Sequence, residues 1–200
     1  MKHIRKALPQ DADAITELRI REFSRSADFK LLKPEALQWG PVDEAQTVIG
    51  VWNGRNQAIA TMRMVRVDDA DQATDILECA LPPVLNYPGL VFNAAATLAD
   101  YRRQGFNQLL RYYCIRYARS MGIRSLLSPV YQSAPRIGFM KQLGYVCHDL
   151  SDSWQTKLKP NSPRILCVLD SGRFDAALAL IETTVPELIR DYPWQGDALD

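Results

Sequence analysis

The sequence predicts one α/β domain with a mixed β-sheet and helices on both faces. Strand and helix patterns follow the order β, α, several β, then β-loop-α-β-α-β. A length of 200 residues suits one such domain with a short appendage, and a hydrophobic content of 47% is ample for a core. We therefore place the domain at residues 1–170 and a C-terminal helical extension, packed on the domain, at residues 171–200.

The first half of the chain predicts a β-hairpin near its N-terminal helix. Asn53-Gly54 lies between two apolar runs, which is a strong hairpin signal. Residues 11–23 are expected to form a helix, and residues 68–75 a polar loop. Strands are predicted at residues 3–7, 47–52, 57–67 and 76–81.

The second half alternates strands with helices that have an apolar face. In the segment after Asn107, apolar residues recur at helical spacing, and Gly122 is a suitable stop. Pro186 is expected to interrupt the last helix. Strands are predicted at residues 90–98, 123–130, from 145 onward and 164–169, and helices at 108–121, 134–143 and 174–190.

Charge and composition exclude several classes of function. Lys and Arg total 24 and Asp and Glu total 23, so the net charge of +1 provides no global field for nucleic acid or an anionic membrane. The start of the chain lacks the apolar segment of a secretory signal, and no apolar run approaches the roughly 20 residues of a membrane helix. The four cysteines and two histidines lack metal-ligand spacing, so we expect no catalytic metal. A soluble cytoplasmic protein with buried, free cysteines is the expectation.

The most informative segment is the basic loop of residues 101–107. It follows the predicted strand at residues 90–98 and opens an amphipathic helix. Backbone N–H groups at a helix N-terminus have no intrahelical partner, and the helix dipole adds positive potential there. Gly105 allows close approach of the backbone, while Arg102 and Arg103 add charge. The loop therefore predicts a cradle for a phosphate or diphosphate.

Two motifs in this part of the chain resemble those of the GNAT superfamily of N-acyltransferases. The first is the loop at residues 102–107, which is similar to the Arg-x-x-Gly-x-(Gly or Ala) acyl-CoA loop of that family, with Asn107 in place of the small residue. The second is Phe139-Met140-Lys141-Gln142-Leu143-Gly144-Tyr145, which resembles the Phe-Tyr-x-Lys-Leu-Gly-Phe segment. The pair spans about residues 90–146. The resemblance implies the GNAT fold, in which the central strands splay apart to admit the pantetheine arm.

The resemblance also implies residues that bind acetyl-CoA or another acyl-CoA. Backbone amides around Thr97, Leu98 and Ala99 would serve the oxyanion and the pantetheine. The loop would hold the diphosphate through Arg102, Arg103, Gln104, Gly105, Phe106 and Asn107. Asn107 either crowds the phosphate or adds a donor. Ser133 falls where the family often has an asparagine near the cofactor, and Arg136 is a candidate phosphate partner.

Acid and base residues are harder to assign from the sequence. Many family members have a tyrosine where this chain has Met140, which carries no proton for a leaving thiolate. Tyr131 is a substitute candidate for the acid, and an ordinary half-buried tyrosine is the alternative interpretation. Glu78 is a candidate base because a carboxylate in an apolar strand acquires a raised pKa, whereas alternation along a strand normally turns such a charge toward solvent.

Three functions fit these observations. The first is transfer of an acyl group, foremost acetyl, from coenzyme A to a primary amine of a small molecule or peptide by direct attack. The second is an N-acyl synthase that takes its acyl chain from acyl carrier protein. The third is a non-catalytic acyl-CoA-binding module. The C-terminal extension covers an exposed sheet edge or mediates a homodimer, and the sequence does not choose between these roles.

Overall fold

The computed structural model describes residues 1–25, 37–82, 84–132, 134–149 and 164–196. In these ranges a mixed sheet has the strand order β1-β2-β3-β4-β5-β7-β6. All neighbouring strands are antiparallel except β4 and β5. The strands are β1 (His3–Lys6), β2 (Thr47–Trp52), β3 (Ala58–Val67), β4 (Gly89–Thr97), β5 (Ser125–Tyr131), β6 (Val146–Asp149) and β7 (Arg164–Asp170).

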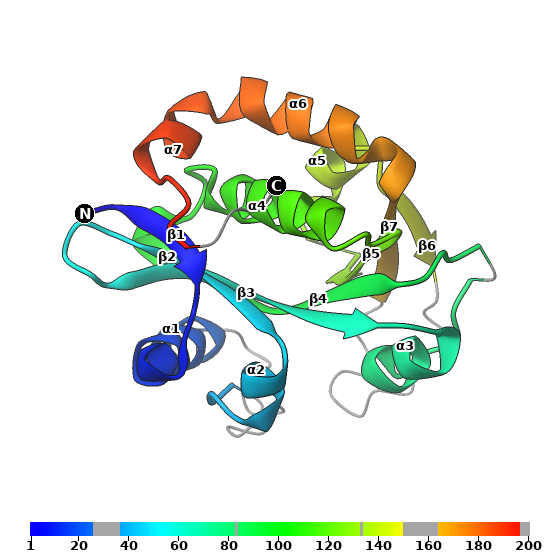
Figure 1. The fold of residues 1–200 in the computed structure, drawn as a ribbon, viewed down its shortest axis with the longest axis horizontal. Helices are drawn as coiled ribbons and strands as arrows, with labels where there is room; N and C mark the ends of the chain where they lie inside the picture. The colour runs from blue at the N-terminus through cyan, green and yellow to red at the C-terminus, as the bar shows by residue number, and fades with distance from the viewer. Residues whose placement is uncertain (26–36, 83, 133, 150–163, 197–200) are drawn as a thin grey trace.

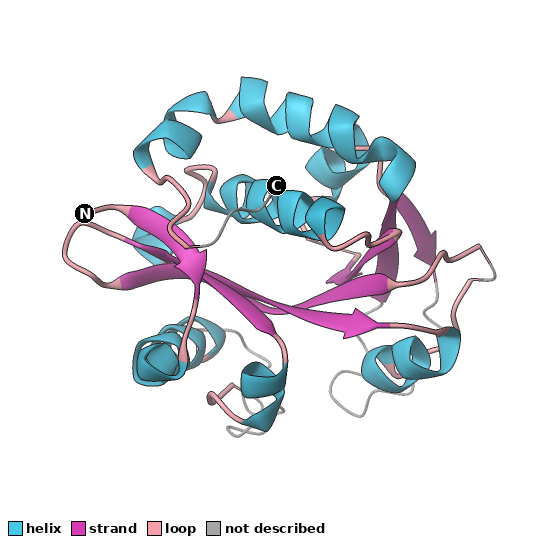
Figure 2. Cartoon of the chain, viewed as in Figure 1, coloured by secondary structure: helices cyan, strands magenta, loops and turns pink. Residues whose placement is uncertain are grey.

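Helices cover both faces of the sheet, as the sequence predicts. Figure 1 shows α1, α2 and α3 on one face and α4 and α5 on the other, with α6 packed outside α4. The same layers are seen by secondary structure in Figure 2. The helices are α1 (Ala12–Phe23), α2 (Pro41–Ala45), α3 (Ala70–Leu77), α4 (Phe106–Ser120), α5 (Ile137–Gln142), α6 (Phe174–Thr184) and α7 (Pro186–Asp191). The predicted break at Pro186 is confirmed.

The helix α4 is the central helix of the domain. Its residues Leu109, Leu110, Cys114 and Ile115 are completely buried, and they pack between the sheet and the C-terminal helix α6. At 3.6 residues per turn these four positions are spread over about 240° of the helix circumference, so more than one side of α4 is buried. The sequence periodicity therefore predicts the helix, whereas the burial of Leu109 and Ile115 on its other sides follows from packing in three dimensions.

The prediction for residues 68–81 is wrong. The polar loop expected at 68–75 is mostly the helix α3, whose N-cap Asp69 accepts a hydrogen bond from Gln72 N at 2.9 Å. The expected strand at 76–81 is absent, because α3 continues to Leu77 and ends there. Ala73 and Leu77, four positions apart, are buried together on the sheet, while Ile76 is exposed. The buried residues of this segment therefore follow the four-residue spacing of a helix. The apolar run of 76–81 was wrongly interpreted as a strand.

The end of the chain covers the edge of the sheet at β1. Ile4 N donates to Pro193 O at 3.1 Å, and Gln195 N donates to Ile4 O at 2.8 Å. A parallel bridge joins Ile4 to Trp194. The backbone of β1 is therefore paired on both sides near Ile4, and one of the two roles considered for the extension, covering a sheet edge, is observed.

Candidate functional site

The parallel strands β4 and β5 separate along their length. They pair only between residues 89–91 and 125–127. Beyond this point β4 continues with β3, and β5 continues with β7. The two central strands therefore open into a gap toward their C-terminal ends, and the predicted splay of the sheet is confirmed.

A β-bulge in β4 accompanies the opening. Asn93 pairs with Arg63 and Ala96 pairs with Thr61, so two residues of β4 lie opposite the single Met62. One of the two, Ala94, has a positive φ of 48°. A bulge bends its strand and leaves one residue out of the ladder. The bulge thus removes a β4 amide from sheet pairing at the gap.

The loop after β4 contains backbone amides that form no backbone hydrogen bond within the described part of the chain. Arg102 N donates to Ala99 O at 3.1 Å, and the next amide to donate to a backbone carbonyl of a described residue is Leu109 N, to Gly105 O at 2.9 Å. The amides of residues 103–108 lie between these two. Arg103 and Gly105 both have positive φ, 59° and 90°, and the first turn of α4 contains no acidic residue. A helix N-terminus of this geometry is suited to an anion.

Beyond close approach of the backbone to an anion, packing also requires glycine at position 105, which the sequence did not indicate. A Cβ at this position would lie 2.8 Å from both Leu188 Cδ1 and Val185 Cγ1, at the start of α7. Its φ of 90° also disfavours any other residue. The α6–α7 segment therefore supports the loop from the side of Gly105, and only glycine fits both the packing and the backbone conformation.

A cavity of about 660 Å³ extends from the loop into the gap between the strands. This volume is typical of a ligand site. Ala95 of the bulge and the adjacent Ala96 also line it, as does Phe139 of α5. The sequence-predicted residues that border the cavity are Thr97, Arg102, Arg103, Gly105, Phe106, Asn107, Tyr131 and Arg136.

Three predicted binding residues do not border the cavity. Leu98 N donates to Ile59 O at 2.9 Å, and Ala99 N donates to Glu22 Oε1 at 3.2 Å, so neither amide is available to an oxyanion. Gln104 is exposed and its Nε2 donates to Asp100 O. The residues of β4 that are left out of the ladder, Ala94 and Ala95, lie two to five residues before the predicted position. Ser133 lies outside the described residues.

Arg102 and Arg103 differ in their surroundings. Arg102 Nη2 donates to Glu22 Oε2 at 2.6 Å, and the Glu22 side chain is only 2% exposed. The charge of Arg102 is therefore already paired, and this residue connects the loop to α1. Arg103 is exposed at the cavity and forms no ion pair with another described residue. Arg103 is thus the loop cation that remains for a ligand.

Glu78 is not where the sequence analysis expected it. It is the C-cap of α3, with φ of 55°, and its side chain is exposed. It does not border the cavity. Glu78 was a candidate base because burial in an apolar strand would raise its pKa. That strand is absent, so this reason no longer applies.

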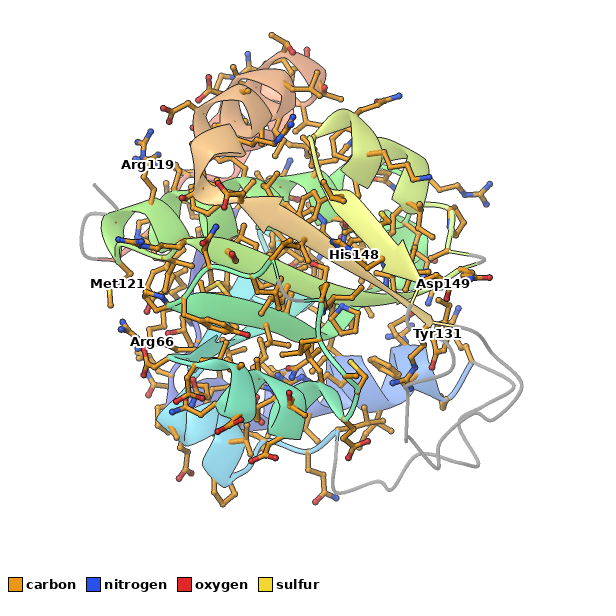
Figure 3. The ribbon with its side chains drawn as sticks, turned by 90° about the vertical axis from the view of Figure 1, so that its right-hand side faces the viewer. Arg66, Arg119, Met121, Tyr131, His148 and Asp149 are labelled. Atoms are coloured by element: carbon orange, nitrogen blue, oxygen red, sulfur yellow. The ribbon has the colours of Figure 1, made fainter. Side chains whose placement is uncertain are left out.

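Tyr131 lies at the rim of the cavity at the end of β5. Figure 3 shows it at the same end of the sheet as Asp149 of β6. Its hydroxyl accepts a long hydrogen bond from Arg164 Nη2 at 3.5 Å, and the Arg164 guanidinium lies 5.3 Å from the ring centre. Met140 is fully buried, so its interpretation as a packed core side chain is confirmed.

A buried arginine lies beneath the cavity. The side chain of Arg111 donates to Tyr145 OH at 2.9 Å, to Ser128 Oγ at 3.4 Å and to Asn107 Oδ1 at 3.2 Å. Burial raises the pKa of Tyr145, and the charge and hydrogen bond of Arg111 oppose this increase. Arg136 is exposed at the rim, yet its guanidinium is crowded enough that desolvation, followed by the like charge of Arg111, lowers its pKa.

Two residues that reach the site from distant elements were not predicted from the sequence. Glu22 comes from α1, and Arg111 reaches Asn107 from one turn further along α4. The only signal for Arg111 is its type: a cation on the apolar side of an amphipathic helix. Glu22 has no local signal at all, because its partner Arg102 is 80 positions away.

The described part of the chain contains neither a membrane-spanning helix nor a cluster of metal ligands. No helix there is long and apolar enough to span a membrane. No group of three or more His, Cys, Asp or Glu side chains in those same ranges could hold a metal ion.

Comparison with known proteins identifies the fold. No protein-family model and no curated protein matches the sequence. Among solved structures, the CoA-dependent acyl-homoserine lactone synthase BjaI, solved with SAM and isopentyl-CoA, matches with a TM-score of 0.70 and 14% identity, over 100% of this chain and 96% of its own.

Two further structures support the same conclusion. The ribosomal-protein-S18-alanine N-acetyltransferase of Escherichia coli matches with a TM-score of 0.55 and 16% identity, over 85% of this chain and 94% of its own. The N-acyl amino acid synthase FeeM, from uncultured soil microbes, matches with a TM-score of 0.59 and 14% identity, over 92% and 99%. This chain therefore has the GNAT fold of N-acyltransferases.

Proposed function

We propose that this protein transfers an acyl group from coenzyme A to a primary amine by direct attack. The observation that carries the proposal is the run of amides at residues 103–108, which form no backbone hydrogen bond with a described residue and lie beyond the end of β4, where β4 and β5 have separated. Such a cradle matches a diphosphate, and the gap has room for an extended arm that leads from it. The GNAT fold of the chain favours the same function.

In this proposal the protein acts mainly by positioning and by hydrogen bonding. Acyl-CoA supplies the activated carbonyl and the thiolate leaving group. The loop amides and Arg103 hold the diphosphate end. The bulge at Ala94 and Ala95 offers the amide that stabilises the oxyanion, in place of the amides of Leu98 and Ala99. Correct orientation of two reactants alone is worth roughly 7–11 kcal/mol.

The proton for the departing thiolate comes from Tyr131 in this scheme, and the proton that the amine loses on forming the amide restores the phenol. Its phenol borders the cavity, whereas Met140 at the position of the family tyrosine is buried and has no proton to give. Glu78 takes no part, because it lies outside the cavity. The acceptor is a small-molecule or peptide amine that reaches the carbonyl from the side of α1.

A second candidate function is N-acyl transfer from acyl carrier protein. The likeness to the CoA-dependent synthase BjaI favours coenzyme A as the donor, whereas the likeness to the N-acyl amino acid synthase FeeM is compatible with either donor. The apolar side chains of Phe23, Leu110 and Phe139 at the cavity would suit an acyl chain longer than acetyl. In this case an acidic carrier protein would approach the exposed Arg103 and Arg136.

The test is an assay of free thiol release with the purified protein. Acetyl-CoA, longer acyl-CoAs and acyl carrier protein are each offered with a library of amines, and the four cysteines of the protein are subtracted as a blank. Turnover with an acyl-CoA supports the first candidate, and activity only with the carrier protein supports the second. Tight cofactor binding without turnover for any amine would instead indicate a binding module.

Charge reversal at Arg103 tests the position of the cradle. Arg103→Glu places an anion beside the diphosphate and should weaken coenzyme A binding about tenfold or more in calorimetry. The matched control is Arg55→Glu, in the exposed β2–β3 turn, which should bind as the unaltered protein does. Gly105→Asp is less suitable, because the new side chain would also collide with Leu188 and Val185. Equal affinity in both arginine variants would place the diphosphate elsewhere.

A further inference from the structure

Asn107 occupies the position where the acyl-CoA loop of GNAT proteins usually has a small residue. It lies in the first turn of α4 and borders the cavity together with Arg103 and Gly105. A side chain here either obstructs an anion or binds it. The hydrogen bonds of Asn107 distinguish these two outcomes.

The orientation of the Asn107 amide follows from its partner. Its Oδ1 accepts a hydrogen bond from Arg111 Nε at 3.2 Å. Arginine has donors only, so the atom that faces Arg111 must be the carbonyl oxygen. The NH₂ group therefore lies on the opposite end of the amide, away from Arg111. Its two protons form no hydrogen bond with another described residue.

Arg111 provides a buried positive charge beneath this amide. Arg111 is 2% exposed, and its other acceptors are the neutral Tyr145 OH, Ser128 Oγ and Met140 Sδ. It makes no ion pair with a carboxylate among the described residues. A buried charge with neutral partners alone is costly, so an anion nearby would stabilise it. The unopposed N-terminus of α4 adds to the same positive potential.

We propose that Asn107 donates a hydrogen bond through Nδ2 to the phosphate attached to pantetheine in the acyl donor, and that Arg111 is the positioning residue that orients this amide. The inference rests on the proposed function, since it assumes a phosphopantetheine thioester in the cavity. Coenzyme A and acyl carrier protein share this phosphate. Asn107 is thus a ligand-binding residue and no obstruction.

Binding measurements with three ligands test the role of Asn107. Calorimetry compares coenzyme A, 4′-phosphopantetheine and pantetheine. Asn107→Ala removes the donor and should weaken both phosphorylated ligands about tenfold. Asn107→Asp keeps the size of the side chain but sets a carboxylate against the phosphate, and should weaken them about a hundredfold. Pantetheine, which lacks phosphate, should bind both variants as it binds the unaltered protein.

Controls separate this inference from the proposed function. Ser120→Asp adds the same charge at the far end of α4 and should leave coenzyme A binding within about twofold. If the unaltered protein binds neither coenzyme A nor a phosphopantetheinylated carrier protein, the proposed function fails. If it binds one of them and Asn107→Asp binds equally well, only the role of Asn107 fails. A loss for coenzyme A without a loss for 4′-phosphopantetheine would overturn the assignment to the pantetheine phosphate.

The positioning role of Arg111 is tested by coupling. Arg111→Lys retains the charge but cannot hold Asn107 through the same planar guanidinium. Alone, it should weaken coenzyme A binding about tenfold, and in the Asn107→Ala background its effect should fall to within about twofold. An equal loss in both backgrounds would mean that Arg111 acts on the fold only. If an Arg111 variant does not fold, the Asn107 variants still test whether Asn107 binds the phosphate.

Discussion

Glu22 and Arg102 illustrate how a single ion pair changes the interpretation of a motif. The loop contains two adjacent arginines, and from the sequence both would contact phosphate. The buried carboxylate of Glu22 engages Arg102 and also accepts the amide of Ala99. One arginine of the motif therefore has a structural role, and Arg103 is left as the cation that a ligand would meet.

Burial makes three of the four thiols poor nucleophiles. Desolvation raises the pKa of Cys114 and of Cys167 to about 12, and that of Cys79 to about 11. Since the thiolate is the reactive form, almost none is present at pH 8, and reactivity should increase only as the pH rises toward these values. We expect iodoacetamide at pH 8 to modify these residues slowly in the native protein and rapidly in urea, as measured by mass spectrometry. Fast native modification of Cys114 would contradict their burial.

Among the secondary-structure elements, a buried charge network joins α1, α2, β3 and β4. Asp43 accepts hydrogen bonds from Arg19 Nη2 at 2.7 Å and from Arg63 Nη1 at 3.3 Å. Arg63 Nε donates further to Asn93 Oδ1 at 2.7 Å. Desolvation lowers the pKa of Arg63, and the charge of Asp43 opposes this effect. The network holds the helices of one face against the strand that carries the bulge.

Removing the carboxylate of this network should destabilise the fold strongly. Asp43→Asn leaves Arg19, which is 0% exposed, without its counter-charge, and breaking a buried ion pair typically costs about 3–5 kcal/mol. Urea denaturation measures the loss in the free energy of unfolding. The exposed pair of Arg66 and Asp68 is the matched control, since Asp68→Asn should cost no more than about 1 kcal/mol. Equal losses in the two variants would contradict the energetic role of burial.

In the molecule as a whole, the C-terminal helices are continuous with the core. Phe174, Ala177, Leu178 and Ile181 of α6 are buried in the same cluster as the sheet and α4. Tyr113 OH of α4 donates to Tyr192 O at 3.1 Å. The extension also contacts the ligand loop at Gly105. Residues after the predicted boundary at residue 170 therefore pack extensively against residues before it.

The cooperativity of this packing can be tested with one core variant. Ile181→Ala removes a fully buried side chain and should lower the free energy of unfolding by about 2–5 kcal/mol, with a single transition in urea. Thr183→Ala, on the exposed side of α6, should change it by no more than about 0.5 kcal/mol. A separate early transition in the Ile181 variant would mean that residues 1–170 unfold as an independent domain.

The sequence predicted the loop, α4 and most strands because their signals are local. The hairpin at Asn53-Gly54, the stop at Gly122 and the spacing of apolar residues in α4 each depend on neighbours a few positions apart. The error at Glu78 arose in a short apolar run, where the periods of a strand and a helix are hardest to distinguish. The bulge at Ala94 and Ala95 was not predicted, because a bulge has no reliable local pattern.

Local sequence thus encodes where the cradle begins and which helix follows it, because capping, glycine conformation and helical periodicity act between near neighbours. The gap between β4 and β5, the pairing of Arg102 with Glu22 and the burial of Arg111 depend instead on contacts between distant segments. Packing in three dimensions brings those segments together, and it therefore decides which amides and charges of the cradle remain free for a ligand.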